Sequence, residues 1–426
     1  MDGRGLQSRQ VSLRVLRRVL EQGAFTNLVL GSELDKAGLQ GADRALATTL
    51  VQSTLRHRNF LRDLLLEASR NGRVPRDIEA LLLLGATQLL LLDRIPDHAA
   101  IDTSVRLSKA QDRGRYTGLV NGLLRNLQRQ RESHLKRRSA ADAPSSWLGP
   151  APAWLMDRWE QRMGKEPARR LQRQLGEPAR IDLRLLEGQD ATQWAEQLAA
   201  EQLPGHPARL SLHGGHPPSL PGFHEGAWIV QDRNAAQVVQ QLPVGGQRVL
   251  DVCAAPGGKT THLAERCPQA ELHAVELHPH RAELVRAALD RCGQKGRVHC
   301  GDARELLPNL GSFDRIVLDA PCTGLGTLRR HPEIGIRRKS KAPKQAQKLQ
   351  KSLLEAAVEA LSPQGFLIYA VCSLEPEEGE QVIQSLLARH PELSLAPTPL
   401  FPEGQGWLGL DGNGDGFYLA LVEKMR

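Results

Sequence analysis

The chain has 426 residues, 40% of them hydrophobic, and a formal net charge of +8. This length allows about three domains of roughly 150 residues each, and the basic balance favours a polyanionic partner without establishing one. The chain opens without a basic stretch followed by an apolar segment, and its most apolar run, residues 80–92, is too short to cross a bilayer. These features argue against an exported or membrane protein, and we expect a cytoplasmic one.

All six cysteines lie in the C-terminal part of the chain, with no C-x-x-C pair and no regular spacing. This pattern predicts neither a disulfide framework nor a structural zinc site, and it fits a reducing compartment. The 14 histidines form no H-E-x-x-H or comparable cluster, so we expect no metal site. Most of these thiols are expected to be buried as small apolar side chains. The six are Cys253, Cys267, Cys292, Cys300, Cys322 and Cys372.

Residues 9–138 repeat apolar side chains at helical spacing and contain only two prolines. Leu13, Leu16 and Leu20 show the spacing on one helical face. We therefore expect residues 1–138 to form an all-α domain with the apolar run as its core helix. Spacing alone is equally compatible with a plain helical bundle.

The composition changes after residue 138. Residues 139–152 are rich in Ala, Ser, Pro and Gly, which is typical of an exposed linker. Residues 153–225 mix helix-like and strand-like stretches, and this mixture predicts a small α+β module, for which we expect a role in RNA binding. Its helices are expected at 154–163, 167–175 and 191–202, and its strand at 181–186.

Residues 226–426 alternate short apolar runs with amphipathic helices. This alternation predicts a Rossmann-like α/β domain with a parallel, doubly wound sheet. Ligands bind beyond the carboxyl ends of the strands in such sheets, so the residues directly after each run are the candidate site residues. The runs are 248–252, 272–275, 298–300, 315–318 and 366–371.

Small residues follow the first of these runs, where they would let the backbone approach a ligand, and Thr260 begins a predicted helix. The stretch lacks the G-x-G-x-x-G spacing of dinucleotide-binding proteins and the full phosphate loop of nucleotide triphosphatases. It is typical of a turn that holds a nucleotide-like cofactor. The residues expected to form this turn are Cys253, Ala254, Ala255, Pro256, Gly257, Gly258 and Lys259.

Acidic residues close the next two strands. Glu276 is placed to accept hydrogen bonds from two ribose hydroxyls, and Asp302 is placed to accept one from an adenine amino group. Either acid alone would equally suit a helix N-cap or a solvated turn. Together with the small-residue turn, the two acids predict an adenosine pocket.

Two cysteines emerge at the same predicted sheet edge, Cys322 just after the fourth strand and Cys372 after the fifth. A thiolate that adds to carbon-6 of cytosine makes carbon-5 reactive toward a sulfonium methyl group. Asp319 is the candidate acid for the ring N3, and Lys259 or the helix after Ser373 could supply positive potential near Cys372. A single cysteine at a strand end would more often be inert packing.

The stretches VLDVCAAPGGKT, DAPCTGLGTLRRHPE, YAVCSLEPEE and DGFYLALV resemble the RNA 5-methylcytosine methyltransferases of the Sun/Fmu (NOL/NOP/Sun) family. The resemblance implies that Cys372 is the nucleophile, that Cys322 assists product release, and that Asp319 contacts both cytosine and cofactor. It also implies that S-adenosylmethionine is held by the turn from Cys253 to Lys259, by Glu276 and by Asp302.

The N-terminal part looks like the RNA-binding fold of the antiterminator NusB, in TLVQSTLRHRNFLRDLLL, LLLLGATQLLLLDRIPDHAAIDTSV and GLVNGLLRNLQRQ. Family members with this combination modify a cytosine in small-subunit (16S) ribosomal RNA, so that substrate is implied. Some family positions differ: Val371 replaces the usual Thr, a Trp is missing after Pro332, and the middle module lacks Leu-Arg-x-Asn. These departures concern packing around the target base.

Two other functions stay open, a methyltransferase of another substrate and a noncatalytic RNA-binding assembly factor. The second is disfavoured, because a scaffold has no need for both strand-end cysteines, the acid and the glycine-rich turn together. A monomer is expected.

Residues 329–348 hold eight Lys or Arg and one acid, Glu333. A solvated face is the ordinary interpretation of such a run, but its place between the two cysteines favours contact with RNA phosphates. Residues 411–416 match the start of a calcium loop, yet Val422 stands at the bidentate acid position and 417–422 is strand-like, so a hairpin turn is expected. The proposed RNA-binding residues are Arg329, Arg330, Arg337, Arg338, Lys339 and Lys341.

Overall fold

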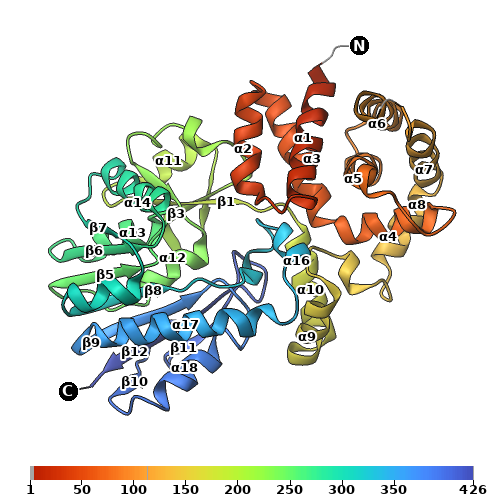
Figure 1. Ribbon diagram of the computed structural model, residues 1–426. Coiled ribbons are helices and arrows are strands. Elements are labelled where there is room, and N and C mark those ends of the chain that lie inside the picture. Colours follow the sequence, from red (N-terminus) through yellow and green to blue (C-terminus); the bar gives the residue numbers. More distant parts are fainter. Residues whose placement is uncertain (1–3, 113, 426) are drawn as a thin grey trace. The chain divides into compact units, whose positions relative to one another are not determined.

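The computed structural model describes residues 4–112 and 114–425 (Figure 1). Its N-terminal part is helical, as predicted, and no strand occurs among the described residues before position 181. The first helices are α1 (Arg4–Leu20), α2 (Thr26–Lys36), α3 (Gly41–Arg56), α4 (Arg58–Ala68), α5 (Arg76–Leu91), α6 (Asp97–Asp112), α7 (Thr117–Arg129) and α8 (Arg131–Ser139).

Helix α5 is the core helix of this part. Its side chains from Ile78 to Leu90 are buried almost without interruption, because α1, α3, α4, α6 and α7 all pack against it. A helix that is apolar on every face needs such surroundings. The prediction of a buried core helix at residues 80–92 is confirmed. No helix in the described part of the chain is long and apolar enough to cross a membrane.

Residues 139–152 were predicted as an exposed linker, and this prediction is wrong. Trp147 is 4% exposed, stacks edge-to-face on Phe60 with ring centroids 5.3 Å apart, and donates its indole N–H to Asp63 at 2.8 Å. The apolar side chains within this Pro- and Ser-rich segment anchor it to the helices beneath. The chain then continues in α9 (Ala153–Met163) and α10 (Lys165–Gly176).

The described residues divide into two compact units. The first unit is Met1–Pro178 with Leu328–Lys339, and the second is Ala179–Thr327 with Ser340–Arg426. Helices α9 and α10 thus group with the N-terminal helices and not with the strands that follow. The segment Leu328–Lys339, which carries α16 (Glu333–Arg337), also belongs to the first unit. The domain boundaries predicted at 138, 152 and 225 do not coincide with this division.

The second unit contains a small antiparallel sheet in the order β2-β3-β1-β4. Its helix α11 (Ala191–Leu198) is capped by Asp190, and it ends four residues earlier than predicted because Ala199 adopts a left-handed φ of 48° before β2 begins. The strands are β1 (Ile181–Leu185), β2 (Glu201–Leu203), β3 (His206–Leu212) and β4 (Trp228–Val230).

The larger sheet of this unit runs β10-β12-β9-β8-β5-β6-β7, with β11 paired to β12. Strands β9, β8, β5, β6 and β7 are parallel, but β12 is antiparallel to β9, so the sheet is mixed where a parallel one was predicted. The predicted hairpin turn at 411–416 is confirmed, because Leu408 of β11 pairs with Phe417 of β12. The strands are β5 (Arg248–Val252), β6 (Glu271–Glu276), β7 (Arg297–Cys300), β8 (Phe313–Asp319), β9 (Leu361–Val371), β10 (Leu393–Leu395), β11 (Gln405–Leu408) and β12 (Phe417–Lys424).

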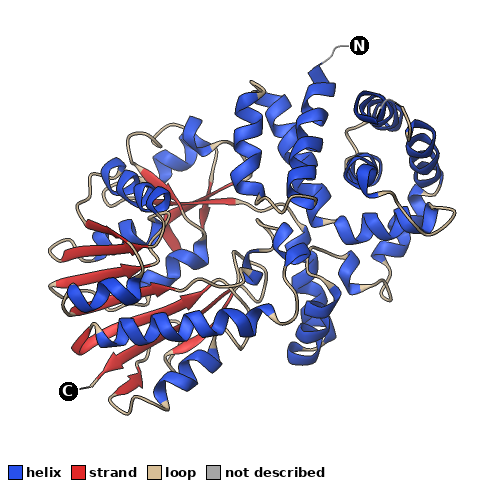
Figure 2. Ribbon diagram, viewed as in Figure 1, coloured by secondary structure: helices blue, strands red, loops and turns tan. Residues whose placement is uncertain are grey.

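Helices cover both faces of this sheet (Figure 2). Alternate residues of β5 enter opposite cores: Val249 packs with α12 (Arg233–Gln240), α13 (Gly258–Arg266) and α14 (Pro279–Arg291), whereas Leu250 packs with α15 (Ala303–Leu306), α17 (Ala342–Glu359) and α18 (Glu380–Leu387). The chain steps from β5 outward to β6 and β7 and then returns to β8 on the other side of β5. A ligand crevice is expected at this reversal.

Candidate active site

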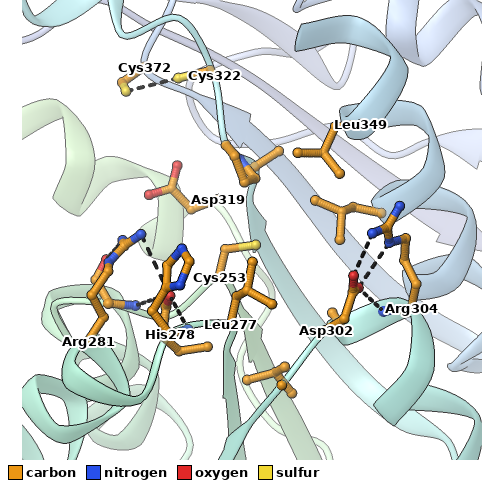
Figure 3. A pocket seen from close by; sticks show the side chains of 18 residues that line it. Cys253, Leu277, His278, Arg281, Asp302, Arg304, Asp319, Cys322, Leu349 and Cys372 are labelled. Atoms are coloured by element: carbon orange, nitrogen blue, oxygen red, sulfur yellow. Dashed lines mark hydrogen bonds and ion pairs between the residues drawn. The ribbon is translucent and has the colours of Figure 1, made fainter.

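A cavity of about 510 Å³ opens at the carboxyl ends of the parallel strands (Figure 3). Its lining includes one predicted residue from the end of each of these strands, as expected for a doubly wound sheet. These residues are Cys253 after β5, Glu276 at the end of β6, Asp302 after β7, Asp319 at the end of β8 and Cys372 after β9, with Cys322 beside them.

The turn after β5 brings backbone close to this cavity. Cys253 has a left-handed φ of 62°, and Gly257 has a φ of 103°, where an added Cβ would lie 2.8 Å from the Cβ of Ala288. Only glycine fits this approach between the turn and α14. Of the seven residues predicted for the turn, Cys253 and Ala255 line the cavity; Ala254, Pro256, Gly257, Gly258 and Lys259 shape the turn behind them.

Cys253 lines the cavity as a neutral thiol. Burial, followed by the nearby carboxylates of Asp319 and Glu276, raises the pKa of Cys253 far above its usual range. Desolvation and negative neighbours both disfavour the thiolate. Cys253 is therefore a neutral part of the cavity wall.

Glu276 is 2% exposed and is oriented by the backbone around it. Its carboxylate accepts hydrogen bonds from the backbone N–H groups of Ala255 at 3.3 Å and His278 at 3.2 Å, and it lies 3.6 Å from the guanidinium of Arg281. These contacts fix the carboxylate at the cavity wall. An acceptor held in this way is suited to a pair of ligand hydroxyl groups.

Asp302 has two roles. It caps α15 by accepting the N–H of Arg304 at 2.9 Å, and the side chain of Arg304 also pairs with it at 2.5 Å. These hydrogen bonds lower the pKa of Asp302, so the carboxylate stays charged at neutral pH. The helix-cap role considered for a lone acid thus applies here, and the same side chain still lines the cavity.

Lys259 and Asp319 form an ion pair, with Nζ and Oδ2 2.5 Å apart. Burial alone would lower the pKa of Lys259, but its attraction to Asp319 and the hydrogen bond between them outweigh burial and raise it. Lys259, the positive charge predicted near Cys372, thus pairs with Asp319. The other predicted source, the helix after Ser373, begins only at Glu380.

The Sγ atoms of Cys322 and Cys372 lie 3.1 Å apart, on turns 50 residues apart in the chain. Both side chains are half-buried and line the cavity, and neither is in a disulfide. The hydrogen bond to Cys372 and burial raise the pKa of Cys322 well above its ordinary value. The raised pKa means that Cys322 keeps its proton at neutral pH.

None of the six proposed RNA-binding residues is among the described residues that line this cavity. Arg329 donates to the backbone O of Pro178 at 2.9 Å, and Arg337 donates to the backbone O of Ala24, both within the first unit. Arg330 and Arg338 are half-buried, whereas Lys339 and Lys341 are exposed. Binding of RNA by these side chains stays a prediction.

Sequence reasoning missed several residues around the cavity. Arg281 and Arg304 pair with the two acids, and Leu349 and Leu353 of α17 form an apolar wall. No local pattern distinguishes these side chains from ordinary helix surface residues. Within residues 4–112 and 114–425, no group of three or more His, Cys, Asp or Glu side chains is arranged to hold a metal ion.

Comparison with known families agrees with these two parts of the chain. The profile of the 16S rRNA methyltransferase RsmB/F family matches residues 239–422, and the NusB family profile matches residues 6–129. Both matches confirm the resemblances drawn from the sequence.

Relatives and solved structures extend the likeness over the whole chain. Ribosomal RNA small subunit methyltransferase B of Klebsiella pneumoniae is 36% identical over 433 residues, 98% of each chain. A probable methyltransferase B of Synechocystis is 33% identical, covering 98% of this chain and all of its own. The solved structure of PH0851 shares the fold with a TM-score of 0.79 at 24% identity, over 100% of this chain and 99% of that one.

NSun6 from Pyrococcus horikoshii, solved with SFG, covers 65% of this chain and 99% of its own with a TM-score of 0.58 at 20% identity, a likeness of fold. The glycine-rich turn, the two acids Glu276 and Asp302 and the two cysteines Cys322 and Cys372 all lie within the residues that the RsmB/F profile matches. The chain therefore belongs to the 16S rRNA methyltransferase RsmB/F family, as an S-adenosylmethionine-dependent methyltransferase with an N-terminal NusB-family domain.

Proposed function

We propose that this enzyme methylates carbon-5 of a cytosine in small-subunit (16S) ribosomal RNA through a covalent adduct with Cys372. The observation that carries the proposal is the pair of thiols 3.1 Å apart on the wall of the same cavity that Glu276 and Asp302 line. A methyltransferase that acts on an oxygen or an exocyclic nitrogen has no need of two adjacent cysteines there.

The cavity suits S-adenosylmethionine, which supplies the methyl group. Cys253 and Ala255 of the turn after β5 line the cavity, and we assign Glu276 to the ribose hydroxyls and Asp302 to the adenine amino group. The apolar side chains of Leu349 and Leu353 complete the lining. All of these side chains belong to the second unit.

The chain's own residues account for the remaining chemistry. A proton passes from the Lys259 ammonium, 2.5 Å from Asp319, through the Asp319 carboxylate to N3 as the Cys372 thiolate adds to carbon-6. After methyl transfer, carbon-5 loses its proton to water, the electrons of that bond form the double bond to carbon-6, and the bond from carbon-6 to Sγ breaks, so that Cys372 leaves as a thiolate. N3 then returns its proton through Asp319 to Lys259. We assign Cys322 to this release step.

Substitution of the two cysteines tests the mechanism. Cys322→Ala is expected to accumulate a covalent complex of protein and RNA, seen as a band that resists denaturing electrophoresis, because the adduct forms but is not released. Cys372→Ala is expected to abolish both adduct and methyl transfer while S-adenosylmethionine still binds. Cys292→Ala, at the C-cap of α14 and outside the cavity, is the matched control.

Methyl transfer by Cys372→Ala at a rate near that of the wild type would remove Cys372 as the nucleophile. Bisulfite sequencing of ribosomal RNA from a deletion strain tests the product independently. One cytosine that loses its protection supports the proposal, whereas an unchanged pattern favours another substrate or a noncatalytic assembly factor.

The remaining expectations are proposals on the same footing. We propose that the enzyme acts as a monomer in the cytoplasm, where a reducing environment would prevent Cys322 and Cys372 from forming a disulfide. RNA binding by residues 153–225 and by the basic run is proposed as well. Lys339 and Lys341 are the exposed members of that run.

A further inference from the structure

One buried acid near the cysteines has no part in the chemistry described above. Glu378 lies in the turn between β9 and α18, six residues after Cys372, and its side chain is fully buried. It does not line the cavity among the described residues. Because a buried carboxylate is costly unless its oxygens accept hydrogen bonds, its partners indicate its role.

The carboxylate of Glu378 connects the two turns that carry the cysteines. Oε1 accepts the backbone N–H of Thr323 at 2.8 Å, and Oε2 accepts the hydroxyl groups of Thr323 at 2.5 Å and Ser373 at 2.6 Å. Thr323 directly follows Cys322, and Ser373 directly follows Cys372. One side chain thus holds the neighbours of both thiols.

Glu378 is itself held in place by the scaffold. Its backbone O accepts the hydroxyl of Tyr369 on β9 at 2.7 Å. Gln350 of α17 donates to Oε1 at 3.0 Å and also to the backbone O of Pro321 at 3.1 Å, so the helix braces both the acid and the first turn. An acceptor-only group with two fixed oxygens is suited to joining two turns in this way.

We propose that Glu378 is a positioning residue that ties the turn of Cys322 to the turn of Cys372 and so holds the two Sγ atoms side by side. Its effect on turnover rests on the proposed function, since the distance between the thiols matters only if both take part. Its effect on the thiols themselves does not rest on that function.

The charge of Glu378 has a second consequence for Cys322. After the hydrogen bond to Cys372, burial and the charge of Cys372, the negative charge of Glu378 adds to the effects that raise the pKa of Cys322. The acid thus helps to keep Cys322 protonated.

Thiol cross-linking tests the positioning directly. A diazene oxidant such as diamide takes two electrons and two protons from neighbouring thiols, giving a disulfide and the hydrazine, and mass spectrometry follows the Cys322–Cys372 disulfide. We expect Glu378→Ala to slow this reaction about 10–100-fold, because a displacement near 1 Å has effects of this order on reactions between held groups. Glu380→Ala is the matched control, since Glu380 instead accepts the indole N–H of Trp407 at 2.6 Å.

Turnover gives the second readout. Glu378→Ala is expected to lower kcat about 100-fold and to leave the KM for S-adenosylmethionine within about twofold, because the acid does not touch the cavity. Glu378→Gln should recover kcat to within about tenfold of the wild type: its amide oxygen can accept from Thr323 and Gln350, and its amide nitrogen can donate to the two hydroxyls, which rotate to accept. A general loss of folded structure would lower the binding of S-adenosylmethionine as well as kcat, so an unchanged KM together with recovery of kcat in Glu378→Gln distinguishes positioning from misfolding.

If Glu378→Ala fails to fold, as judged by loss of S-adenosylmethionine binding, Thr323→Val and Ser373→Ala carry the test. Each removes one hydroxyl and should slow cross-linking in the same direction by a smaller factor. Cross-linking at the wild-type rate in the folded variants overturns the positioning role, whatever Cys372 does in catalysis. Slower cross-linking in Glu378→Ala together with methyl transfer by Cys372→Ala would uphold the positioning role and overturn the proposed mechanism instead.

Discussion

Asp251, near the end of β5, is buried without a full set of partners. Its Oδ2 accepts the hydroxyl of Thr260 at 2.6 Å, whereas Oδ1 has no hydrogen-bond partner among the described residues. Burial raises the pKa of Asp251 to about 7, and the hydrogen bond from Thr260 and the charge of Lys259 oppose this rise only in part. The folded state therefore favours the protonated carboxyl.

Stability should consequently depend on pH through this one group. A folded-state pKa raised from 3.8 to about 7 gives a stabilisation that is complete below pH 3.8 and is lost as the pH rises toward 7. Asp251→Asn cannot ionise, so its stability relative to the wild type should increase by about 1.4 kcal/mol per pH unit across that window and level off above it. Urea unfolding of both proteins at pH 5, 6, 7 and 8 measures the difference. A constant difference would contradict the shifted pKa.

For single residues, the sequence predicted which side chains line the cavity better than it predicted their hydrogen-bond and ion-pair partners. Glu276, Asp302, Asp319, Cys322 and Cys372 were found because each closes a strand, and the parallel order of the strands brings strand ends together. Their mutual contacts were not found. Lys259 and Asp319 are 60 residues apart, and no local pattern records that they pair.

Glu378 shows the same limit more sharply. It lies in the stretch YAVCSLEPEE, whose three acids resemble a solvated turn. Only the fold places Thr323 and Ser373 around its carboxylate.

At the scale of elements, the segment Leu328–Lys339 departs most from its sequence pattern. Its five Lys and Arg residues suggested a solvated, RNA-facing surface, yet its centre is buried in the first unit. Glu333 is fully buried and accepts the backbone N–H of Thr26 at 3.0 Å, and Arg337 lies over the ring of Phe25 at 4.4 Å. Composition could not reveal this, because the partners lie some 300 residues earlier in the chain.

Gly335 in α16 shows how closely this segment is packed. An added Cβ would lie 2.4 Å from the backbone O of Pro150, a distance that requires backbone to move. We expect Gly335→Ala to destabilise the first unit by about 1–3 kcal/mol, the usual cost of overpacking. Gly118→Ala in α7, where nothing lies within 4 Å, is the control and should stabilise by about 0.5–1 kcal/mol through helix propensity. Equal melting of the two variants would show that α16 is not packed as described.

The strands show why some elements are easy to predict. The run 248–252 coincides with β5, because Val249, Leu250 and Val252 give it apolar side chains on both faces, as expected for a strand that is buried on both sides. The antiparallel direction of β12 has no such signature, since β12 is also an apolar run and its direction depends on the turn before it. The segment 139–152 was mispredicted from composition because one buried Trp outweighs its Pro and Ser residues.

At the scale of the whole molecule, the chain crosses between the two compact units more than once, at Pro178, at Thr327 and again at Lys339. The cavity is lined only by residues of the second unit among those described. S-adenosylmethionine bound in this cavity, as proposed, would contact only residues of the second unit among those described.

We therefore expect calorimetry to resolve two unfolding transitions, of which S-adenosylmethionine raises only one. At a cofactor concentration 100 times its Kd, mass action stabilises the binding unit by about 2.7 kcal/mol. Trp147 and Trp159 are buried in the first unit and Trp228 in the second, so single-tryptophan variants assign each transition. Glu276→Ala, which removes a cavity carboxylate, should abolish the shift. A single transition that moves as a whole with cofactor would instead mean that the two units unfold cooperatively.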